Sequence, residues 1–271
     1  MSGVVDFTGQ RVLVTGASSG IGAGLAEEFA RRGAVVGICA RRKARLEEVL
    51  ARCRAHSPGS RMWVTDMADS SQVDLLASAA LEELGGVDVL VNNAGIPKRR
   101  KITDLDLGTV KSVMNVNYFS AVNLTLALLP SMLAQHHGSI INVSSIAATL
   151  SSPGEAAYDA SKAALTAFSE AMAVDVWETG VKVLVVYPGL VDTELFSLPD
   201  NDPVPDTPVT PIPVSELVAA VFDALERGGS QVYVPGWFGD VFARKAQDPD
   251  AYLSGVADFM AQQRSTGAPQ S

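Results

Sequence analysis

Two patterns of apolar residues alternate along the first 190 residues of the chain. Short runs rich in Val, Leu and Ile are typical of buried strands and recur at 11–15, 34–39, 61–65, 87–91, 139–143 and 181–187. Between them, apolar residues at helical spacing predict helices at 21–32, 43–55, 70–84, 107–133 and 156–179. Strands that alternate with helices across short connections indicate a doubly wound parallel sheet with helices on both faces, an α/β fold.

The pattern changes after residue 189. Prolines at 199, 203, 205, 208, 211 and 213 exclude a helix or a central strand over 197–213. We expect 190–214 to be a loop that covers a substrate, with an apolar inner face and with Asp200, Asp202 and Asp206 in water; a linker without substrate contact is the alternative. The inner face would consist of Leu195, Phe196, Leu198, Val204, Val209 and Ile212. A helix at 215–227, a strand at 231–234 and a helical tail at 236–271, helical near 252–263, are predicted to follow.

Composition narrows the class of protein. The chain has 271 residues, 47% of them apolar, and a net charge of −9, which does not suit a nucleic-acid partner. Cys39 and Cys53 are too few for a disulfide framework or a four-cysteine zinc site, and no metal is expected. The first ten residues lack the apolar core of a signal peptide. No membrane span is expected, because the apolar stretch 124–133 is short and contains Pro130, so the predicted location is cytoplasmic.

Three smaller features leave alternatives open. The adjacent His136 and His137 are read as a solvated helix end rather than metal ligands. The basic run at 98–101 is either solvated or attracts an anionic group of a substrate. Trp237 and Phe238 either belong to the core or form a wall of a pocket or a partner contact.

A glycine-rich turn, TGASSGIG at 15–22, separates the first strand from the first helix. Gly16 suits a tight turn, Gly20 lets the backbone approach a pyrophosphate, and Gly22 lets the helix pack closely on the sheet. The free N–H groups at the start of a helix bind anions, and a purely structural turn is the alternative. The residues predicted to contact a dinucleotide here are Gly16, Ser18, Ser19, Gly20, Ile21 and Gly22.

The end of the second strand indicates which dinucleotide is bound. Ala40 stands where an acidic residue would bind the ribose 2′-hydroxyl of NAD, and Arg41 and Arg42 follow it. A guanidinium pairs with a 2′-phosphate, so NADP is predicted in preference to NAD; a solvated helix start is the alternative. Asp66, with Met67 beside it, is placed to contact the adenine, and a helix cap is the other reading of Asp66.

Three further motifs complete a set: NNAG at 92–95, the pair Ser144 and Ser145, and YDASK at 158–162. Together with the glycine-rich turn they make residues 8–195 resemble the short-chain dehydrogenase/reductase family. The resemblance implies a single Rossmann-type domain over 1–271 and nicotinamide-dependent oxidoreduction of an alcohol or carbonyl.

The residues support the same chemistry on physical grounds. Tyr158 and Lys162 lie four apart on a predicted helix and therefore share a face. A nearby ammonium lowers the pKa of a phenol, so Tyr158 is predicted to exchange a proton with the substrate. Ser145 is expected to orient the substrate oxygen. The resemblance implies that Asn117 supports Lys162 through water.

The resemblance also implies further cofactor contacts, from Asn93, Ala94, Gly95, Tyr158, Lys162, Pro188, Gly189, Val191 and Thr193. The sequence lacks the glycine-rich final motif with which many family members build a tetramer. A homodimer through the helices that contain Asn117 and Tyr158 is therefore expected, and a tetramer remains open.

The sequence predicts an NADP-dependent oxidoreductase for a medium-sized hydrophobic ketone or secondary alcohol. The alternatives are a dinucleotide-binding regulator without turnover, and an isomerase or lyase on the same scaffold.

Overall fold

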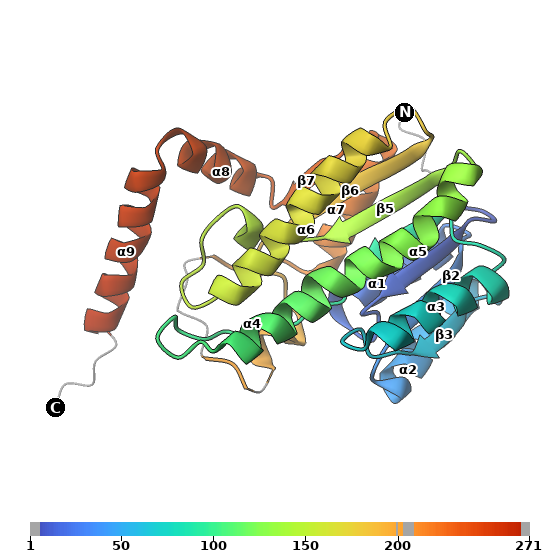
Figure 1. Ribbon diagram of the computed structural model, residues 1–271, viewed down its shortest axis with the longest axis horizontal. Helices are drawn as coiled ribbons and strands as arrows, with labels where there is room; N and C mark the ends of the chain where they lie inside the picture. Colours follow the sequence, from blue (N-terminus) through green and yellow to red (C-terminus); the bar gives the residue numbers. More distant parts are fainter. Residues whose placement is uncertain (1–5, 199, 203–208, 267–271) are drawn as a thin grey trace.

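The computed structural model describes residues 6–198, 200–202 and 209–266 (Figure 1). Within these residues the strands form one seven-stranded sheet in the order β3-β2-β1-β4-β5-β6-β7, and every neighbouring pair is parallel. The strands are β1 (Arg11–Thr15), β2 (Val35–Ala40), β3 (Arg61–Val64), β4 (Val89–Asn92), β5 (Gly138–Val143), β6 (Val181–Pro188) and β7 (Gln231–Val234). The predicted α/β fold with a doubly wound parallel sheet is confirmed.

Helices cover both faces of the sheet, and each face has its own apolar core. One face packs against α1 (Gly20–Arg31), α2 (Lys43–His56) and α7 (Val214–Glu226). The other packs against α3 (Ser70–Glu83), α5 (Ser120–Ala134) and α6 (Ala156–Asp175). Alternation along β1 explains the division, since Val12 and Val14 belong to the first core and Leu13 belongs to the second.

The long helix predicted at 107–133 is interrupted. It consists of α4 (Leu107–Met114), one π-helical turn η1 (Asn115–Phe119) and α5. Pro130 lies inside α5 and does not break it, in agreement with the helix predicted through residue 133. It is exposed, as is Leu126 one turn earlier, so the carbonyl that loses its helical partner faces water. The stretch Leu107–Ala134 is long and apolar enough to cross a membrane, and 44% of it is buried against the rest of the fold. A core helix meets the same criterion, so this is weak evidence for a span.

The remaining elements lie around the carboxyl ends of the strands. They are the short helices η2 (Ile146–Ala148) and η3 (Glu194–Ser197) and the tail helices α8 (Trp237–Gln247) and α9 (Pro249–Thr266). Figure 1 shows the tail helices extending away from the sheet beside α6. The tail holds two helices rather than one, because Asp248 caps the backbone N–H of Ala251 at 2.9 Å and Pro249 starts α9.

Candidate active site

A cavity of about 870 Å³ opens at the carboxyl ends of the strands. Crevices in doubly wound sheets form there, where β1 and β4 lead in opposite directions along the strand order. All the site residues predicted from the sequence line this cavity except Gly22 and Asn117. The sheet therefore brings together residues as far apart in the chain as Gly16 and Thr193.

The glycine-rich turn is folded tightly onto the end of β4. Gly16 has φ +66°, and a Cβ there would lie 2.8 Å from the Cα of Ala94. Gly22 does not line the cavity; a Cβ there would lie 2.4 Å from the Asn93 amide nitrogen, so glycine lets α1 approach β4. Thr15 was missed as a site residue. Its hydroxyl accepts hydrogen bonds from the backbone N–H groups of Asn93 and Ala94 at 3.0 and 3.1 Å, and it fixes both turns.

The two arginines after β2 differ in their surroundings. Arg42 donates to the hydroxyls of Ser18 and Ser19 at 2.8 and 2.7 Å, so it is not a solvated helix start. Arg41 is exposed at the cavity and makes no hydrogen bond or ion pair among the described residues. Asp66 lines the same end of the cavity and does not cap α3; Asp69 does, accepting from the backbone N–H of Ser71 at 3.0 Å.

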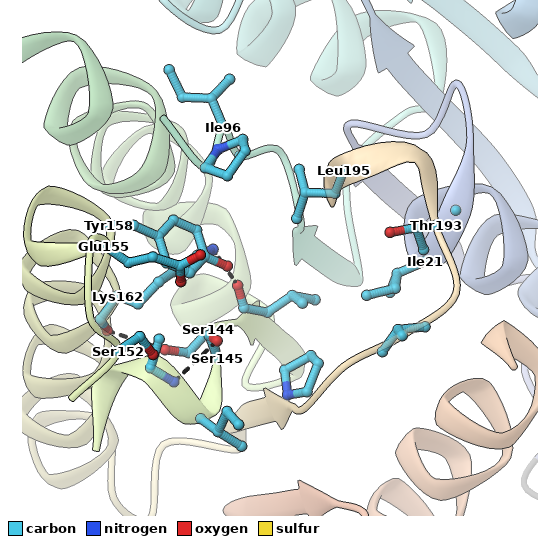
Figure 2. Close-up of a pocket in the computed structure, with 18 of the residues that line it drawn as sticks. Ile21, Ile96, Ser144, Ser145, Ser152, Glu155, Tyr158, Lys162, Thr193 and Leu195 are labelled. Carbon is cyan, nitrogen blue, oxygen red and sulfur yellow. Dashed lines mark hydrogen bonds between the residues drawn. The ribbon is translucent and has the colours of Figure 1, made fainter. Parts of the chain in front are cut away.

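Ser145, Tyr158 and Lys162 lie together on one side of the cavity, and Thr193 and Leu195 lie on the opposite side (Figure 2). Ser145 follows β5, whereas Tyr158 and Lys162 share one face of α6. The Ser145 hydroxyl lies beside Tyr158 and accepts from the backbone N–H of Ala147 at 3.1 Å. Burial, and then the charge of Glu155, raises the pKa of Tyr158, while the Ser145 hydroxyl acts to lower it. The phenol is therefore protonated at neutral pH.

Lys162 differs from expectation in its effect on Tyr158. Its Nζ donates to the carbonyl of Val143 at 2.8 Å and lies 5.8 Å from the centre of the tyrosine ring. Burial lowers the pKa of Lys162 to about 8. The expected lowering of the Tyr158 pKa by this ammonium is wrong for this structure, because burial of the phenol is the larger influence.

Asn117 lies in the π-helical turn, next to the site rather than in it. Its side chain donates to the carbonyl of Ile96 and the hydroxyl of Ser161, both at 3.0 Å, and accepts from the Ile96 N–H at 2.8 Å. It therefore joins the segment after β4 to α6, and the water link to Lys162 stays a prediction. Ser144 also lines the cavity, and its hydroxyl donates to the Lys162 carbonyl at 3.1 Å and is hydrogen-bonded to the Thr166 hydroxyl at 2.9 Å.

The basic segment 98–101 has a role that the sequence did not reveal. Lys98 and Arg100 both pair with Asp200, and the backbone N–H of Lys101 donates to Asp202 at 3.0 Å. The segment thus holds the loop after β6, and the two aspartates do not simply face water. The solvated reading is wrong for the buried Arg99, and attraction of an anionic substrate group stays a prediction.

Arg99 lies at the centre of this contact. It is 3% exposed, donates to the carbonyl of Asp202 at 3.0 Å, and lies 3.8 Å from the Glu155 carboxylate. Glu155 lines the cavity one turn before Tyr158. Both residues were missed, because no local pattern links an arginine after β4 to a glutamate before α6.

The rest of the substrate end is apolar. Leu195, Leu198 and Val209 line it from the loop, as predicted, and Ile212 instead joins the sheet core. The Phe196 side chain, Val204 and Asp206 lie outside the described residues. The tail helices complete the wall with Trp237, Phe238, Val241, Tyr252, Val256, Phe259 and Met260. Phe238 is both buried and a wall residue, whereas Trp237 is 46% exposed and belongs to the wall but not to the core.

No group of three or more His, Cys, Asp or Glu side chains that could hold a metal ion occurs in the described part of the chain. Both cysteines are buried free thiols, and burial raises the pKa of each to about 12. His136 and His137 are exposed at the end of α5.

The comparisons with known proteins agree with this geometry. A family model described as short chain dehydrogenase matches residues 10–202. The chain is 39% identical to dehydrogenase/reductase SDR family member 7B of Mus musculus over 188 residues, which is 68% of this chain and 58% of the mouse protein. It is 37% identical to 11-beta-hydroxysteroid dehydrogenase 1A of Arabidopsis thaliana over 261 residues, 90% of this chain and 74% of the plant protein. The chain thus spans about three-fifths of the length of the first curated relatives it matches.

Solved structures share the whole architecture. A short-chain dehydrogenase from Sphingobium yanoikuyae in complex with NADPH superposes with a TM-score of 0.77 at 26% identity, covering 97% of each chain. Structures with this fold include complexes with NADPH and with NAD. The chain belongs to the short-chain dehydrogenase/reductase family.

Proposed function

We propose that this protein is an NADP-dependent oxidoreductase that interconverts a medium-sized hydrophobic ketone and its secondary alcohol. The observation that carries the proposal is the contrast inside one cavity. Ser145 and Tyr158 supply hydroxyl groups on one side of it, whereas Leu195, Val256 and Phe259 supply an apolar wall at the substrate end. Pockets that bind small molecules combine apolar walls with a few such polar groups.

The side chains have distinct roles in this proposal. The nicotinamide, when bound, gives or accepts the hydride. The Ser145 hydroxyl hydrogen-bonds the carbonyl oxygen and orients it. The Tyr158 hydroxyl donates a proton to that oxygen during reduction and takes it back during oxidation. The raised pKa of Tyr158 keeps the phenol protonated at neutral pH, which is the form that donates a proton to a carbonyl oxygen.

The preference for NADP rests on Arg41 and Arg42. Both line the cavity at the end of β2, where the adenosine ribose binds in this fold, and Ala40 leaves no acid to repel a phosphate. The glycine-rich turn at 15–22 also fits a dinucleotide. Because Gly16 packs closely against Ala94, the start of α1 has room for a pyrophosphate. Thr193, whose methyl group would lie 3.1 Å from a Cβ on Gly20, faces the same cradle from the other side.

The substrate class follows from the walls. The described loop and tail residues there are mostly apolar, so a sugar or a phosphate ester would lose hydrogen bonds to water without replacement. The relative named as a hydroxysteroid dehydrogenase belongs with large apolar alcohols and ketones, in agreement with these walls. Such pockets discriminate weakly between similar shapes, so several substrates are expected.

Oxidation of NADPH with a panel of ketones tests this proposal. Bulky apolar ketones should be reduced, and ketose phosphates should not. A regulator would bind NADPH without consuming it, and an isomerase or lyase would convert its substrate without net change in cofactor; either result would overturn the proposed reaction.

We also propose a homodimer through α5 and α6. Phe119, just before α5, and Leu126, within α5, are 55% and 57% exposed. Val174, in the last turn of α6, and Trp177, just after α6, are 74% and 76% exposed. Exposed apolar side chains gathered on neighbouring helices indicate an interface. Sedimentation equilibrium should give a dimer, and Leu126→Glu with Val174→Glu should shift it to a monomer.

A further inference from the structure

The cofactor end of the cavity already contains an anion, the carboxylate of Glu194. Ser19 donates its hydroxyl hydrogen to this carboxylate at 2.7 Å, and Arg42 and Arg45 each form an ion pair with it. Arg42 also bridges the Ser18 and Ser19 hydroxyls. Burial raises the pKa of Glu194, but the bonds from Ser19, Arg45 and Arg42 outweigh it and lower the pKa to about 2, so the group is charged.

This set of donors suits a phosphate at least as well as a carboxylate. Two guanidinium groups and two hydroxyls at the start of α1 are the groups that bind phosphate oxygens in proteins. Arg42 is also one of the two arginines to which the proposed function assigns the 2′-phosphate. A carboxylate and a phosphate therefore need the same cations.

We propose that Glu194 competes internally with the 2′-phosphate of NADP for Arg42 and Arg45, and that it thereby sets how strongly the protein prefers NADP to NAD. The inference rests on the proposed preference for NADP. Binding of the 2′-phosphate displaces the carboxylate, and Arg45 becomes a second cation for the phosphate. NAD has no phosphate there and leaves Glu194 in place.

The position of Glu194 gives this exchange a consequence for the substrate. Glu194 directly follows Thr193 and opens η3, and Leu195 next to it lines the substrate end. Displacement of the carboxylate releases the first turn of the loop from α2. The loop is then free to adjust over the substrate once NADP is bound, which couples cofactor loading to the pocket.

The test is Glu194→Gln, which keeps the shape and the Ser19 hydrogen bond and removes the charge. Glu47→Gln is the matched control. It makes the same change in net charge on α2, but the Glu47 carboxylate lies 3.8 Å from the Lys43 ammonium and is not one of the groups assigned to the phosphate site. Calorimetry gives the Kd of adenosine 2′,5′-bisphosphate and of adenosine 5′-monophosphate, and fluorescence gives those of NADPH and NADH.

Glu194→Gln should lower the Kd of the bisphosphate and of NADPH at least about fivefold, because a carboxylate no longer occupies Arg42 and Arg45 before the phosphate binds. The monophosphate and NADH should change by less than about twofold, and Glu47→Gln should change none of the four by more than about twofold. Unchanged or weaker binding of the bisphosphate to Glu194→Gln, or an equal gain for the monophosphate, would overturn the proposal.

Arg45→Ala provides an independent measurement. In the wild type, Arg45 pairs with Glu194 before the phosphate binds and with the phosphate afterwards, so its removal costs the free and the bound protein an ion pair each. In the Glu194→Gln variant only the bound protein loses one, so Arg45→Ala should weaken bisphosphate binding more there than in the wild type. Equal losses would also overturn the proposal. Failure of the proposed preference for NADP would look different: the wild type would bind NADH as tightly as NADPH, and Arg41→Ala would change neither of these two Kd values.

Discussion

The two ends of the cavity are assembled by different interactions. At the cofactor end, the turns after β1 and β4 are fixed by close backbone contacts, such as Gly16 against Ala94 and the Thr15 hydroxyl against two backbone N–H groups. At the substrate end, the loop after β6 is held by charged side chains about 100 residues away, through Lys98, Arg99 and Arg100. The two turns at the cofactor end thus depend on steric fit, whereas the loop at the substrate end depends on ion pairs and hydrogen bonds.

This difference has consequences for stability and for evolution of specificity. Backbone contacts of the first kind allow almost no substitution, since a Cβ at Gly16 or Gly22 would overlap its neighbours. Ion pairs at a partly exposed loop are individually weak and depend on salt. The cofactor end is therefore expected to be rigid, and the substrate end to be adjustable.

Tyr158 lies between the two ends, and its substitution should have the largest effect. Tyr158→Phe removes the proposed proton donor and keeps the ring, so kcat should fall about 10² to 10⁴-fold while the Kd of NADPH stays within about twofold. Stopped-flow measurement of NADPH oxidation and a fluorescence titration check this.

Tyr252→Phe is the control for Tyr158→Phe, because Tyr252 also lines the cavity but lies on α9, away from Ser145. It should keep nearly all activity. If Tyr158→Phe retained a rate near that of the wild type, proton transfer by Tyr158 would be ruled out.

The same difference explains how far the sequence predicted the structure. The glycine-rich turn, Ser145 and the Tyr158–Lys162 pair lie within single elements, where spacing determines geometry, and the structure brings them together. Arg99 with Glu155, and Glu194 with Arg42 and Arg45, join segments far apart in the chain and could not be predicted, because no local pattern encodes them. The pKa of Tyr158 was predicted in the wrong direction for a related reason, since burial depends on the whole fold.

Substitution of Arg99 should weaken binding at the substrate end and leave binding at the cofactor end nearly unchanged. Arg99→Leu removes the bond to the loop and leaves the Glu155 carboxylate buried without its cation. Bonds to a charged group contribute roughly 1.5–3 kcal/mol, so the KM of the ketone should rise at least about tenfold, with little change in the Kd of NADPH. Lys101→Leu is the control, since only the backbone of Lys101 contacts the loop. Equal losses of ketone and cofactor affinity would contradict the claim that the two ends of the cavity are held by different interactions.

Arg41→Ala should have the opposite pattern. It removes a cation from the cofactor end, so the preference for NADPH over NADH should fall about tenfold while the KM of the ketone is unchanged. Lys43→Ala, two residues further on, should leave the ratio of the two Kd values as it is. Loss of both cofactors to the same extent would mean that Arg41 does not contact the 2′-phosphate.

The pH dependence of reduction should follow Lys162 rather than Tyr158. The pKa of Lys162 is lowered to about 8, so its ammonium is charged below that pH and neutral above it, whereas the raised pKa of Tyr158 keeps the phenol protonated throughout. Between pH 7 and 8.5, kcat/KM should fall about fourfold. Lys162→Arg keeps its charge over this range, so any activity it retains should not fall. A wild-type profile that is flat to pH 9.5 would contradict this assignment.

The smallest effect is expected at Asp200, whose ion pairs with the basic segment are partly exposed. Its side chain is 63% exposed and pairs with both Lys98 and Arg100, and exposed pairs contribute only about 0.2–1 kcal/mol each. Asp200→Asn should therefore raise the KM of the ketone about two- to fivefold at low salt. The Debye length shrinks from about 10 Å at 0.1 M to about 3 Å at 1 M salt, so the KM of the wild type should rise toward that of the variant as salt is added. Asp104→Asn, a nearby exposed aspartate in the segment after β4, should behave like the wild type at every salt concentration. If added salt raised the KM of Asp200→Asn as steeply as that of the wild type, the salt dependence would come from elsewhere, and the loop would not be held by this ion pair.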